Sequence, residues 1–443
     1  MIPRTNVHLL KPNMNYAQTL EYMFSALPMY HRVGNQAFKK GLDNIISLCE
    51  ALGQPQNHFK TVHIAGTNGK GSTSHSIAAI LQSAGYKTGL YTSPHLKNFN
   101  ERIRINGHAI DENNVISFIS QHKALLDDIK PSFFEMTVAM AFWHFAQQNV
   151  DIGVIEVGLG GRLDSTNIIR PEISVITNIS FDHMEMLGNT LPLIAAEKAG
   201  IIKMFVPVVV GEYQPEVAPI FQEKASEENA HLHFAEDSIA VQRKSNNAYG
   251  QIFDITLNGQ PYLHDLTYQL QGFYQQKNLV TVIAAIEQLR QRGWQIAEQD
   301  IRRGLGHVID LTGLKGRWQK IGNEPLVICD TGHNESGLQQ VLEQIRAQKY
   351  EQLFMVIGVV REKDLAKFLQ LLPQEAYYFF CQPSVPRGLP ATELAEAAAN
   401  AGLRGQVVEH PNDALKAALG MAKPQDFIFV GGSTFVVADI EAV

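Results

Sequence analysis

The chain has 443 residues, 45% of them hydrophobic and 18% charged, so it carries enough apolar material for folded cores and is long enough for two or three domains. Its 37 basic and 44 acidic residues give a net charge of -7, which argues against binding nucleic acid by phosphate neutralisation. No signal peptide or membrane-spanning run is visible, and three widely spaced cysteines support neither a disulfide framework nor a zinc site. We therefore expect a cytoplasmic protein that acts on small molecules, with neither nucleic acid nor a membrane as partner.

The first half of the chain alternates short β-branched runs with helical stretches. The predicted strands cover residues 61–65, 88–92, 151–157, 173–179 and 206–210. This alternation predicts a mostly parallel sheet covered on both faces. Residues 212–271 are more polar, and the pattern around Asn258-Gly259 is typical of a hairpin, which predicts a small antiparallel excursion. A helix is predicted over 276–292, and the glycine-rich residues 304–318 predict a domain linker.

A second alternating series follows this linker. Its predicted strands cover residues 325–330, 352–360, 376–381, 405–409 and 426–432, with helices beginning near residues 334, 363, 392 and 412. Five strands and four helices are sufficient for a separate Rossmann-like domain. The predicted fold class is α/β: a mostly parallel P-loop ATPase domain over residues 1–308 and a smaller Rossmann-like domain over 309–443.

A glycine-rich turn between the first strand and a helix has the geometry that cradles phosphates. The predicted ATP-binding residues there are Thr67, Asn68, Gly69, Lys70, Gly71, Ser72 and Thr73. Lys70 would contribute a point charge to the phosphates, and the Ser72 hydroxyl would ligate magnesium. The pattern GxxxxGK[ST] is not met literally, because Ile64 replaces its first glycine and Gly71 follows Lys70, so an ordinary turn stays an alternative.

A second glycine cluster, residues 158–161, also follows a strand. It lacks the third glycine of a dinucleotide site, where Leu163 stands, and this argues against NAD or FAD.

Polar side chains follow several of the predicted strands. Glu156 and His183 end neighbouring strands of the first sheet, where open α/β sheets bind ligands, so a shared metal site beside Lys70 is one interpretation. A salt bridge or a structural histidine is the other. Asp330 ends the first strand of the second series, and a helix cap would also account for the acidic and amide residues of that turn. Arg317 lies close enough to the linker to reach a phosphate if the second domain closes on the nucleotide.

Together these motifs resemble the folylpolyglutamate synthase/dihydrofolate synthase family of the Mur ligase superfamily, over nearly the whole chain. The motifs that carry the resemblance are AGTNGKGST from residue 65, YTSPHL from 91, ERIRING from 101, FFEMT from 133, EVGLGGRLDSTN from 156, FDHMEMLG from 181, AAEKAGIIK from 195, LKGRW from 314 and DTGHN from 330.

The resemblance implies an ATP-dependent ligase that depends on Mg²⁺ and acts as a monomer. ATP would phosphorylate the carboxylate of dihydropteroate or of a reduced folate's glutamyl tail, and L-glutamate would attack the acyl phosphate to form an amide. ADP and phosphate would be released. Phosphorylation gives an otherwise unreactive carboxylate a leaving group, and the protein must neutralise the phosphate charge and position the amine.

The resemblance also implies roles for individual residues. The implied metal ligands are Ser72, Ser93, Glu156 and His183, and Lys198 is the implied carbamyl-lysine, in which the modification turns a cation into a carboxylate. Lys70, His183, Lys198 and His333 are implied in catalysis, with His333 approaching the terminal phosphate. The implied nucleotide contacts outside the loop are Asn278, Arg317 and Asp330. The implied pterin and folate contacts are Ser132, Phe134, Leu163, Asp164 and Ser165.

The sequence departs from the family pattern after Asp330. Gly332 stands where alanine is usual and Glu335 where proline is usual, so the contacts of this helix start are less defined, although activity is expected to survive.

Three other functions are weighed against the bifunctional ligase. A monofunctional folylpolyglutamate synthase is the nearest. A ligase for a cell-wall nucleotide precursor usually carries a further domain before the phosphate loop, which here begins by Gly66. A GTPase switch would show an NKxD motif, and none follows the loop.

Overall fold

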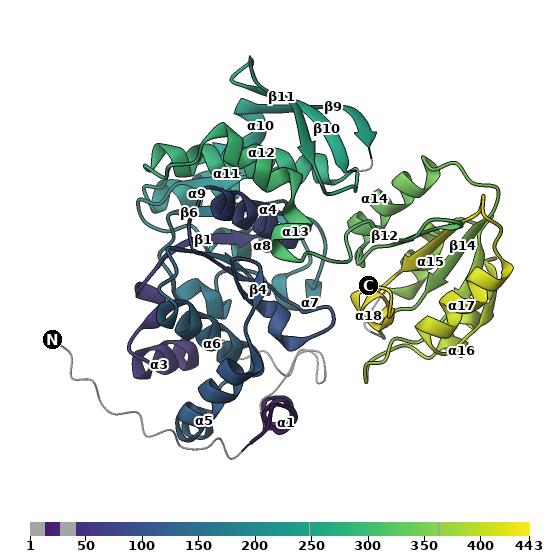
Figure 1. Ribbon diagram of the computed structural model, residues 1–443, viewed down its shortest axis with the longest axis horizontal. Helices are drawn as coiled ribbons and strands as arrows, with labels where there is room; N and C mark the ends of the chain where they lie inside the picture. Colours follow the sequence, from purple (N-terminus) through teal and green to yellow (C-terminus); the bar gives the residue numbers. More distant parts are fainter. Residues whose placement is uncertain (1–13, 27–40, 248, 362–363) are drawn as a thin grey trace.

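The computed structural model describes residues 14–26, 41–247, 249–361 and 364–443. Two sheets organise these residues into two units (Figure 1). The first unit is built on an eight-stranded sheet and carries a small three-stranded sheet. The C-terminal unit is built on a six-stranded sheet. This is the predicted α/β class.

The eight-stranded sheet has the order β4-β3-β2-β5-β1-β6-β7-β8. From β2 to β8 neighbouring strands are parallel, and β3 and β4 form an antiparallel edge. The strands are β1 (Lys60–Ala65), β2 (Thr88–Tyr91), β3 (Ile103–Ile105), β4 (His108–Ala109), β5 (Ile152–Glu156), β6 (Ile173–Ile176), β7 (Val208–Val210) and β8 (Leu232–Phe234). All five predicted strands are confirmed.

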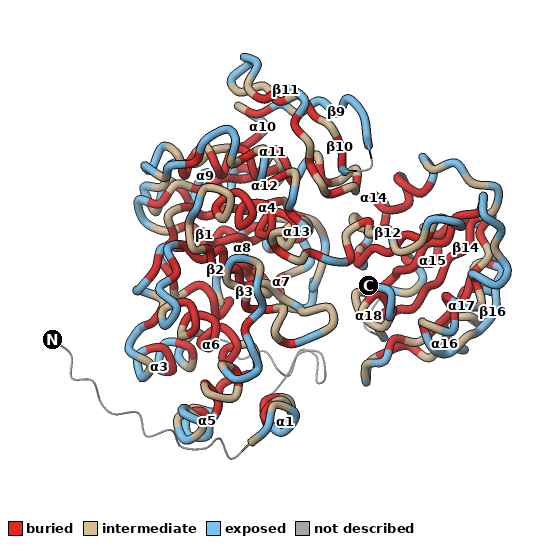
Figure 2. The backbone as a smooth tube through the Cα atoms, viewed as in Figure 1, coloured by how far each residue is buried: buried red, intermediate tan, exposed pale blue. Residues whose placement is uncertain are grey.

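Helices cover both faces of this sheet, which is why its central strands are buried along nearly their whole length (Figure 2). One face packs mainly on α4 (Lys70–Ser83), α11 (Gln275–Gln291) and α12 (Glu298–Gly306). The other face packs on α3 (Asp43–Ala51), α5 (Glu112–Ile129), α6 (Phe133–Gln147), α8 (Leu191–Ala199) and α9 (Ala218–Glu227). The remaining helices are α1 (Tyr16–Ala26), η2 (Pro55–Asn57), η3 (Phe99–Arg102), η4 (Ser165–Ile168), α7 (Met184–Leu187), α10 (Ala235–Ser238) and α13 (Val308–Thr312).

The antiparallel excursion is shorter than predicted. It contains β9 (Ile239–Asn247), β10 (Gly250–Leu257) and β11 (Gln260–Tyr268), and Asn258-Gly259 forms the predicted hairpin turn between the last two strands. Residues 218–234 instead supply α9 and β8, and β8 extends the main sheet in parallel. β8 was not predicted because it has only three residues and lies in a polar region of the sequence.

The predicted linker is also largely helical. Its first residues end α12, and α13 packs on α4, with His75 Nδ1 2.8 Å from Thr312 Oγ1. Gly313 then ends α13 in a left-handed conformation, with φ of 67°. A helix of five residues is too short to show the periodicity by which a helix is recognised.

The C-terminal unit has the sheet order β12-β13-β17-β14-β15-β16, in which only β12 is antiparallel. Its strands are β12 (Gln319–Gly322), β13 (Leu326–Cys329), β14 (Leu353–Ile357), β15 (Tyr377–Phe380), β16 (Arg404–Val407) and β17 (Phe427–Gly431). Its helices are α14 (Glu335–Arg346), α15 (Leu365–Leu371), α16 (Ala391–Asn400), α17 (Pro411–Met421) and α18 (Thr434–Asp439). The five predicted strands and four predicted helices are confirmed, and β12 and α18 were not predicted. In the described residues, no helix has the length and apolar character that a membrane span requires.

Candidate active site

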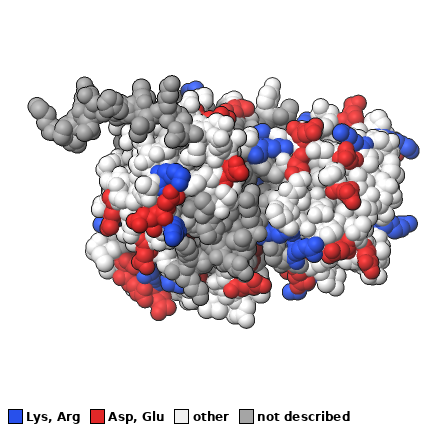
Figure 3. Space-filling view, turned by 90° about the horizontal axis from the view of Figure 1, so that it is seen from below, with Lys and Arg blue, Asp and Glu red and all other residues white. Residues whose placement is uncertain are grey.

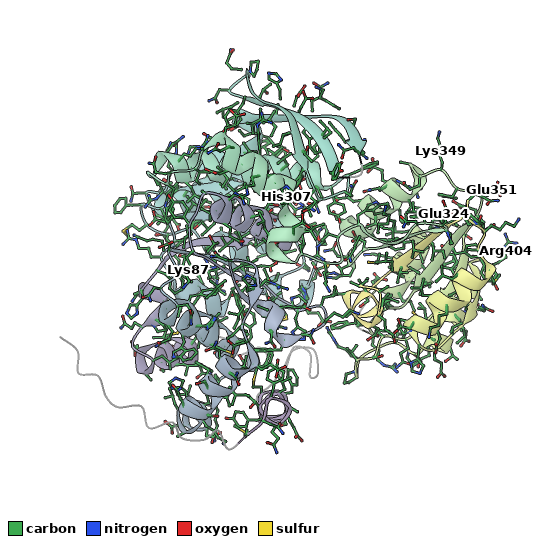
Figure 4. The ribbon with its side chains drawn as sticks, in the orientation of Figure 1. Lys87, His307, Glu324, Lys349, Glu351 and Arg404 are labelled. Carbon is green, nitrogen blue, oxygen red and sulfur yellow. The ribbon has the colours of Figure 1, made fainter. Side chains whose placement is uncertain are left out.

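A cavity of about 1060 Å³ lies between the two units. Its walls come from the phosphate loop, the carboxyl ends of β2 and β5, residues 181–187, residues 313–317 that join the units, and the turn after β13. Charged side chains at the outer end of the C-terminal unit, such as Glu324, Lys349, Glu351 and Arg404 in Figure 4, do not line this cavity. Strand ends from two sheets therefore meet at one cavity.

The phosphate loop runs from the end of β1 to the start of α4, and two of its glycines are required by their surroundings. Gly66 has φ of 142°, and a Cβ there would lie 1.8 Å from Thr177 Oγ1. Gly69 has φ of 85°, and its Cβ would lie 2.2 Å from Asn278 Oδ1. Only glycine fits both positions without displacing a neighbour, so the loop keeps its backbone close to the adjoining strand and helix.

Two lysines converge on the carbonyl groups of this loop. Lys70 Nζ donates to Gly66 O and Thr67 O at 3.0 and 3.1 Å. Lys198, which is 3% exposed on α8, donates to Gly66 O at 2.8 Å. Burial, together with the nearby Lys70, lowers the pKa of Lys198 to about 7. The site thus holds two lysine side chains, and burial favours the neutral amine of the second.

The remaining loop residues differ in their access to the cavity. Thr67 through Ser72 line it, whereas Thr73 is fully buried inside α4. Ser72 Oγ accepts a hydrogen bond from Gln275 Nε2 at 3.1 Å.

Glu156 ends β5 and is 5% exposed at the cavity floor. Its Oε2 accepts a hydrogen bond from Ser93 N at 3.0 Å. Burial raises the pKa of this carboxyl, and the positive charge of Lys70 opposes the rise. His183 lines the same cavity at the start of α7. In the described residues no three His, Cys, Asp or Glu side chains are grouped as a metal cage, so the protein alone offers only a partial ligand set.

A hydrogen-bond network joins the phosphate loop to the C-terminal unit. Asn334 Nδ2 donates to Asn68 Oδ1 at 2.8 Å and to Asp182 Oδ2 at 3.1 Å. His333 Nε2 lies 3.7 Å from the same Asp182 oxygen. Burial raises the pKa of Asp182, but His333 and Asn334 outweigh it and hold that pKa well below its usual range. The Asp182 carboxylate of the first unit is therefore contacted by two side chains of the C-terminal unit, Asn334 and His333.

The turn after β13 keeps its helix start despite Gly332 and Glu335. Asn334 caps α14 by accepting a hydrogen bond from Gly337 N at 2.9 Å, so the cap alternative holds for this residue. Asp330 has different partners: its two oxygens accept from Gly332 N and Trp318 N, both at 2.7 Å.

Arg317 faces the cavity from the segment between the units, and its guanidinium donates to Thr331 Oγ1. Asn278 does not line the cavity. It lies behind Gly69 and donates to Gln275 Oε1 at 2.8 Å.

All five predicted acceptor contacts, Ser132, Phe134, Leu163, Asp164 and Ser165, line the cavity. Two of them also have a local structural task. Ser132 caps α6 in a capping box with Glu135, and the buried Asp164 accepts from the backbone N–H groups of Gly158, Leu159 and Thr166. Phe134 is only partly buried, and its ring centroid lies 6.2 Å from that of Tyr91.

Sequence reasoning missed several residues of this site. Tyr274 and Asp182 line the cavity, and Gln275 contacts Ser72, but none of them was assigned a role. Their hydrogen bonds join segments separated by up to 203 residues, so no local spacing could show them.

Two family models match the chain. The Mur ligase middle domain matches residues 64–286, and the Mur ligase glutamate ligase domain matches residues 316–434. The folylpolyglutamate synthase of Lacticaseibacillus casei is 33% identical over 430 residues, covering 94% of this chain and 96% of that protein. The chain belongs to the folylpolyglutamate synthase family of Mur ligases. It is accordingly an ATP-dependent ligase that forms carbon–nitrogen bonds.

Further relatives extend the likeness to full length. The dihydrofolate synthase/folylpolyglutamate synthase of Escherichia coli is 32% identical, with 98% of each chain covered. A solved structure of E. coli FolC with DHPP and ADP is 30% identical, has a TM-score of 0.84 and covers 96% of this chain and 97% of its own. A structure of a bifunctional relative with Mn, AMPPNP and L-glutamate is 28% identical, with a TM-score of 0.82 and coverage of 96% and 97%.

Proposed function

We propose that this chain is a bifunctional ligase that joins L-glutamate to dihydropteroate and also to the glutamyl tail of reduced folates. The observation that carries the proposal is the single cavity, which holds the phosphate loop, Glu156 and the partly exposed ring of Phe134 within one space. The names of the relatives supply the two acceptors, and one relative is named for the second activity alone. A monofunctional synthase is therefore the first alternative.

The proposed chemistry proceeds through an acyl phosphate. A carboxylate oxygen of the acceptor attacks the terminal phosphorus of ATP, and ADP leaves. The amine of L-glutamate then attacks the acyl carbon, phosphate leaves and the nitrogen loses a proton. Lys70 and Arg317 would neutralise the phosphate oxygens, and His333 would approach the terminal phosphate from the C-terminal unit. Asp330 would contact the nucleotide in the cavity, and Asn278 would serve nucleotide binding from behind Gly69, where it supports the loop.

A divalent cation fits the donors at the cavity floor. Within the described residues Glu156 accepts one hydrogen bond, at Oε2, which leaves Oε1 for a cation. Serine hydroxyls at Ser72 and Ser93 and the imidazole of His183 would complete a set that leaves room for phosphate oxygens. We propose Mg²⁺, while the relatives' structures contain Mn. Bound there, the cation would neutralise developing phosphate charge.

Lys198 is the proposed carbamyl-lysine. Its lowered pKa leaves a free amine at neutral pH, which carbamylation by carbon dioxide requires, and the resulting carboxylate would lie beside the phosphate loop.

The other proposals concern the molecule as a whole. We propose a monomer with an ATP-binding domain over residues 1–308 and a glutamate ligase domain over residues 309–443. Its three cysteines are buried and unpaired, which supports a reducing, cytoplasmic compartment. Acidic and basic side chains are mixed on the face shown in Figure 3, which supports small-molecule partners rather than nucleic acid.

The deciding assay is ATP-dependent phosphate release with L-glutamate, run with dihydropteroate and separately with tetrahydrofolate, with products identified by mass. Release with both acceptors is expected. Release with tetrahydrofolate alone would assign the monofunctional activity. Release with neither, combined with binding of a UDP-sugar peptide, would assign a different Mur-type amino-acid ligase.

Replacing either of two proposed catalytic residues should abolish ligation with both acceptors. Lys70→Ala removes the lysine of the loop itself, and His183→Ala removes a proposed metal ligand, so each should lower kcat by about 10³-fold or more. Circular dichroism should match the unmodified protein, because both side chains face the cavity rather than a core. Near-normal turnover in either variant would exclude the proposed site.

A further inference from the structure

The short segment from Gln271 to Asn278 touches both units through side-chain hydrogen bonds. It leads from β11 into α11, and so belongs to the first unit by chain order. Toward the phosphate loop, Gln275 Nε2 donates to Ser72 Oγ at 3.1 Å, and Gln275 Oε1 accepts from Asn278 Nδ2 at 2.8 Å. Gln275 is fully buried, so these hydrogen bonds form out of water and fix the start of α11 against the loop.

The residues just before Gln275 contact the C-terminal unit instead. Gln344 of α14, 2% exposed, accepts a hydrogen bond from Phe273 N at 2.7 Å and donates to Gln271 O at 3.1 Å. Arg243 of β9 also lies over the Phe273 ring, 4.1 Å from its centroid. The side-chain amide of Gln344 thus holds the backbone on the N-terminal side of Tyr274 at two points, and this fixes the position of the Tyr274 backbone.

Tyr274 reaches from this clamped segment to Asp330. Its hydroxyl donates to Asp330 Oδ2 at 2.6 Å, the short distance expected when a hydroxyl meets a carboxylate. Burial and the adjacent Asp330 raise the pKa of Tyr274 well above its usual value, so the hydroxyl keeps its proton and acts as donor. Both side chains line the cavity, and Asp330 is 2% exposed.

The other donors to Asp330 come from its own unit. Trp318 N and Gly332 N fix the two Asp330 oxygens relative to β13, but these hydrogen bonds do not connect Asp330 to the phosphate loop. Tyr274 is the described side chain that ties this carboxylate to the first unit.

We propose that Tyr274 is a nucleotide-positioning residue, which holds the Asp330 carboxylate at a fixed distance from the phosphate loop so that one nucleotide can contact both. This inference rests on the proposed role of Asp330 in binding the nucleotide. Tyr274 acts through Asp330, and its neighbour Gln275 secures the opposite end of the same segment on Ser72.

Tyr274→Phe removes one oxygen atom and keeps the ring, so it tests the hydroxyl alone. Loss of a hydrogen bond to a charged group is equivalent to a roughly 10- to 150-fold change in an equilibrium constant. We expect the Kd for ADP, measured by titration calorimetry, and the KM for ATP to rise about 10-fold or more. The KM for the acceptor and kcat should change less than about twofold.

Tyr268→Phe is the matched control. Tyr268 is fully buried, whereas Tyr274 is partly exposed to the cavity. The Tyr268 hydroxyl lies 2.8 Å from Ser76 Oγ, but Tyr268 does not line the cavity. A loss of ADP affinity in Tyr268→Phe as large as in Tyr274→Phe would show that any buried hydroxyl in this region has the same effect, and would overturn the proposal.

A double-mutant cycle with Asp330→Ala separates positioning from packing. If Tyr274 acts through Asp330, Tyr274→Phe should weaken ADP binding no further once Asp330 is replaced; Asp330→Leu, which has a similar size and no acceptor, serves if Asp330→Ala does not fold. An equal loss in both backgrounds, or unchanged ADP affinity in Tyr274→Phe alone, would overturn the inference. Because ADP binding needs no turnover, failure of the proposed ligation, seen as absent phosphate release by the unmodified protein, would be distinguishable.

Discussion

At the scale of single residues, burial prepares Lys198 for a reaction that an exposed lysine would undergo poorly. The lowered pKa of about 7 makes the neutral amine the major form above that pH, whereas an unperturbed lysine would be almost fully protonated. Lys203 offers a comparison nearby: burial lowers its pKa too, but its Nζ donates to Asn167 O rather than to the phosphate loop.

Lys198 should therefore carry a carbamate whose amount rises with pH. Only the neutral amine adds carbon dioxide, so the carbamate signal in ¹³C NMR with labelled bicarbonate should grow as pH increases from 6 to 8. Lys198→Met should lose both the signal and most of the ligase activity, about 100-fold or more, while Lys203→Met should keep the signal. A signal that survives in Lys198→Met would assign the modification elsewhere.

The sequence alone indicated the chemistry of Glu156 and Lys70, since both stand at strand ends or in a glycine-rich turn. It could not indicate Ser93 or Lys198 without the family resemblance, because a Ser-Pro turn and a helical lysine have ordinary structural explanations. It indicated no role for Asp182 either, because this residue gains its role only when β6 and the C-terminal unit meet at Asn334.

At the scale of elements, the turn between β1 and α4 needs a glycine at position 69. A second glycine, Gly85, has a similar φ but different surroundings and serves as a comparison. Gly69 and Gly85 have φ of 85° and 89° and lie at opposite ends of α4. A Cβ on Gly69 would collide with Asn278, whereas one on Gly85 would meet nothing within 4 Å.

Gly69→Ala should thus be worse than Gly85→Ala in both stability and ADP binding. Gly85→Ala should lower the free energy of unfolding by about 1–2 kcal/mol, from backbone strain alone. Gly69→Ala adds displacement of Asn278 and should weaken ADP binding at least about 10-fold, measured by calorimetry beside urea unfolding. Equal ADP affinity in the two variants would mean that the loop tolerates a wider turn.

Element prediction succeeded where runs were long and failed where they were short. The apolar runs that became β1, β5 and β14 are unambiguous because both faces of their sheets are covered. Two- to five-residue elements such as β4, β8 and α13 are held by pairing and packing with distant segments, so their own sequences carry too little periodicity to identify them.

At the scale of the whole molecule, the two large sheets could be predicted from two separate alternating series of strands and helices. The contacts that bring the two units together could not be predicted. The pairing of Asn68 with Asn334 and of Tyr274 with Asp330 spans the two units, and each hydrogen bond depends on the final packing of both. Nucleotide binding between the units would strengthen the same arrangement, because a ligand that binds only the assembled site stabilises it by mass action.

Stability of the assembled first unit should also depend on keeping two histidines neutral. His63 of β1 lies 2.9 Å from Thr166 Oγ1 and His75 of α4 lies 2.8 Å from Thr312 Oγ1, and both are nearly or fully buried. Burial lowers the pKa of each to about 3, with nearby cations, Lys203 for His63 and Arg104 for His75, adding to the shift.

The protein should therefore lose stability as pH falls from about 6.5 toward 3. At pH values between the histidine pKa near 6.5 in the unfolded chain and the pKa near 3 in the folded chain, each of these histidines is protonated only when the chain unfolds. The free energy of unfolding therefore decreases as the pH falls. At pH 5 the loss should be about 2 kcal/mol per histidine, measured by urea unfolding at pH 7.5, 6 and 5. The double variant His63→Gln and His75→Gln should show a shallower pH dependence, whereas His264→Gln, whose side chain is 67% exposed, should match the unmodified protein. If the double variant kept the full pH dependence, buried carboxylates rather than these imidazoles would have to account for it.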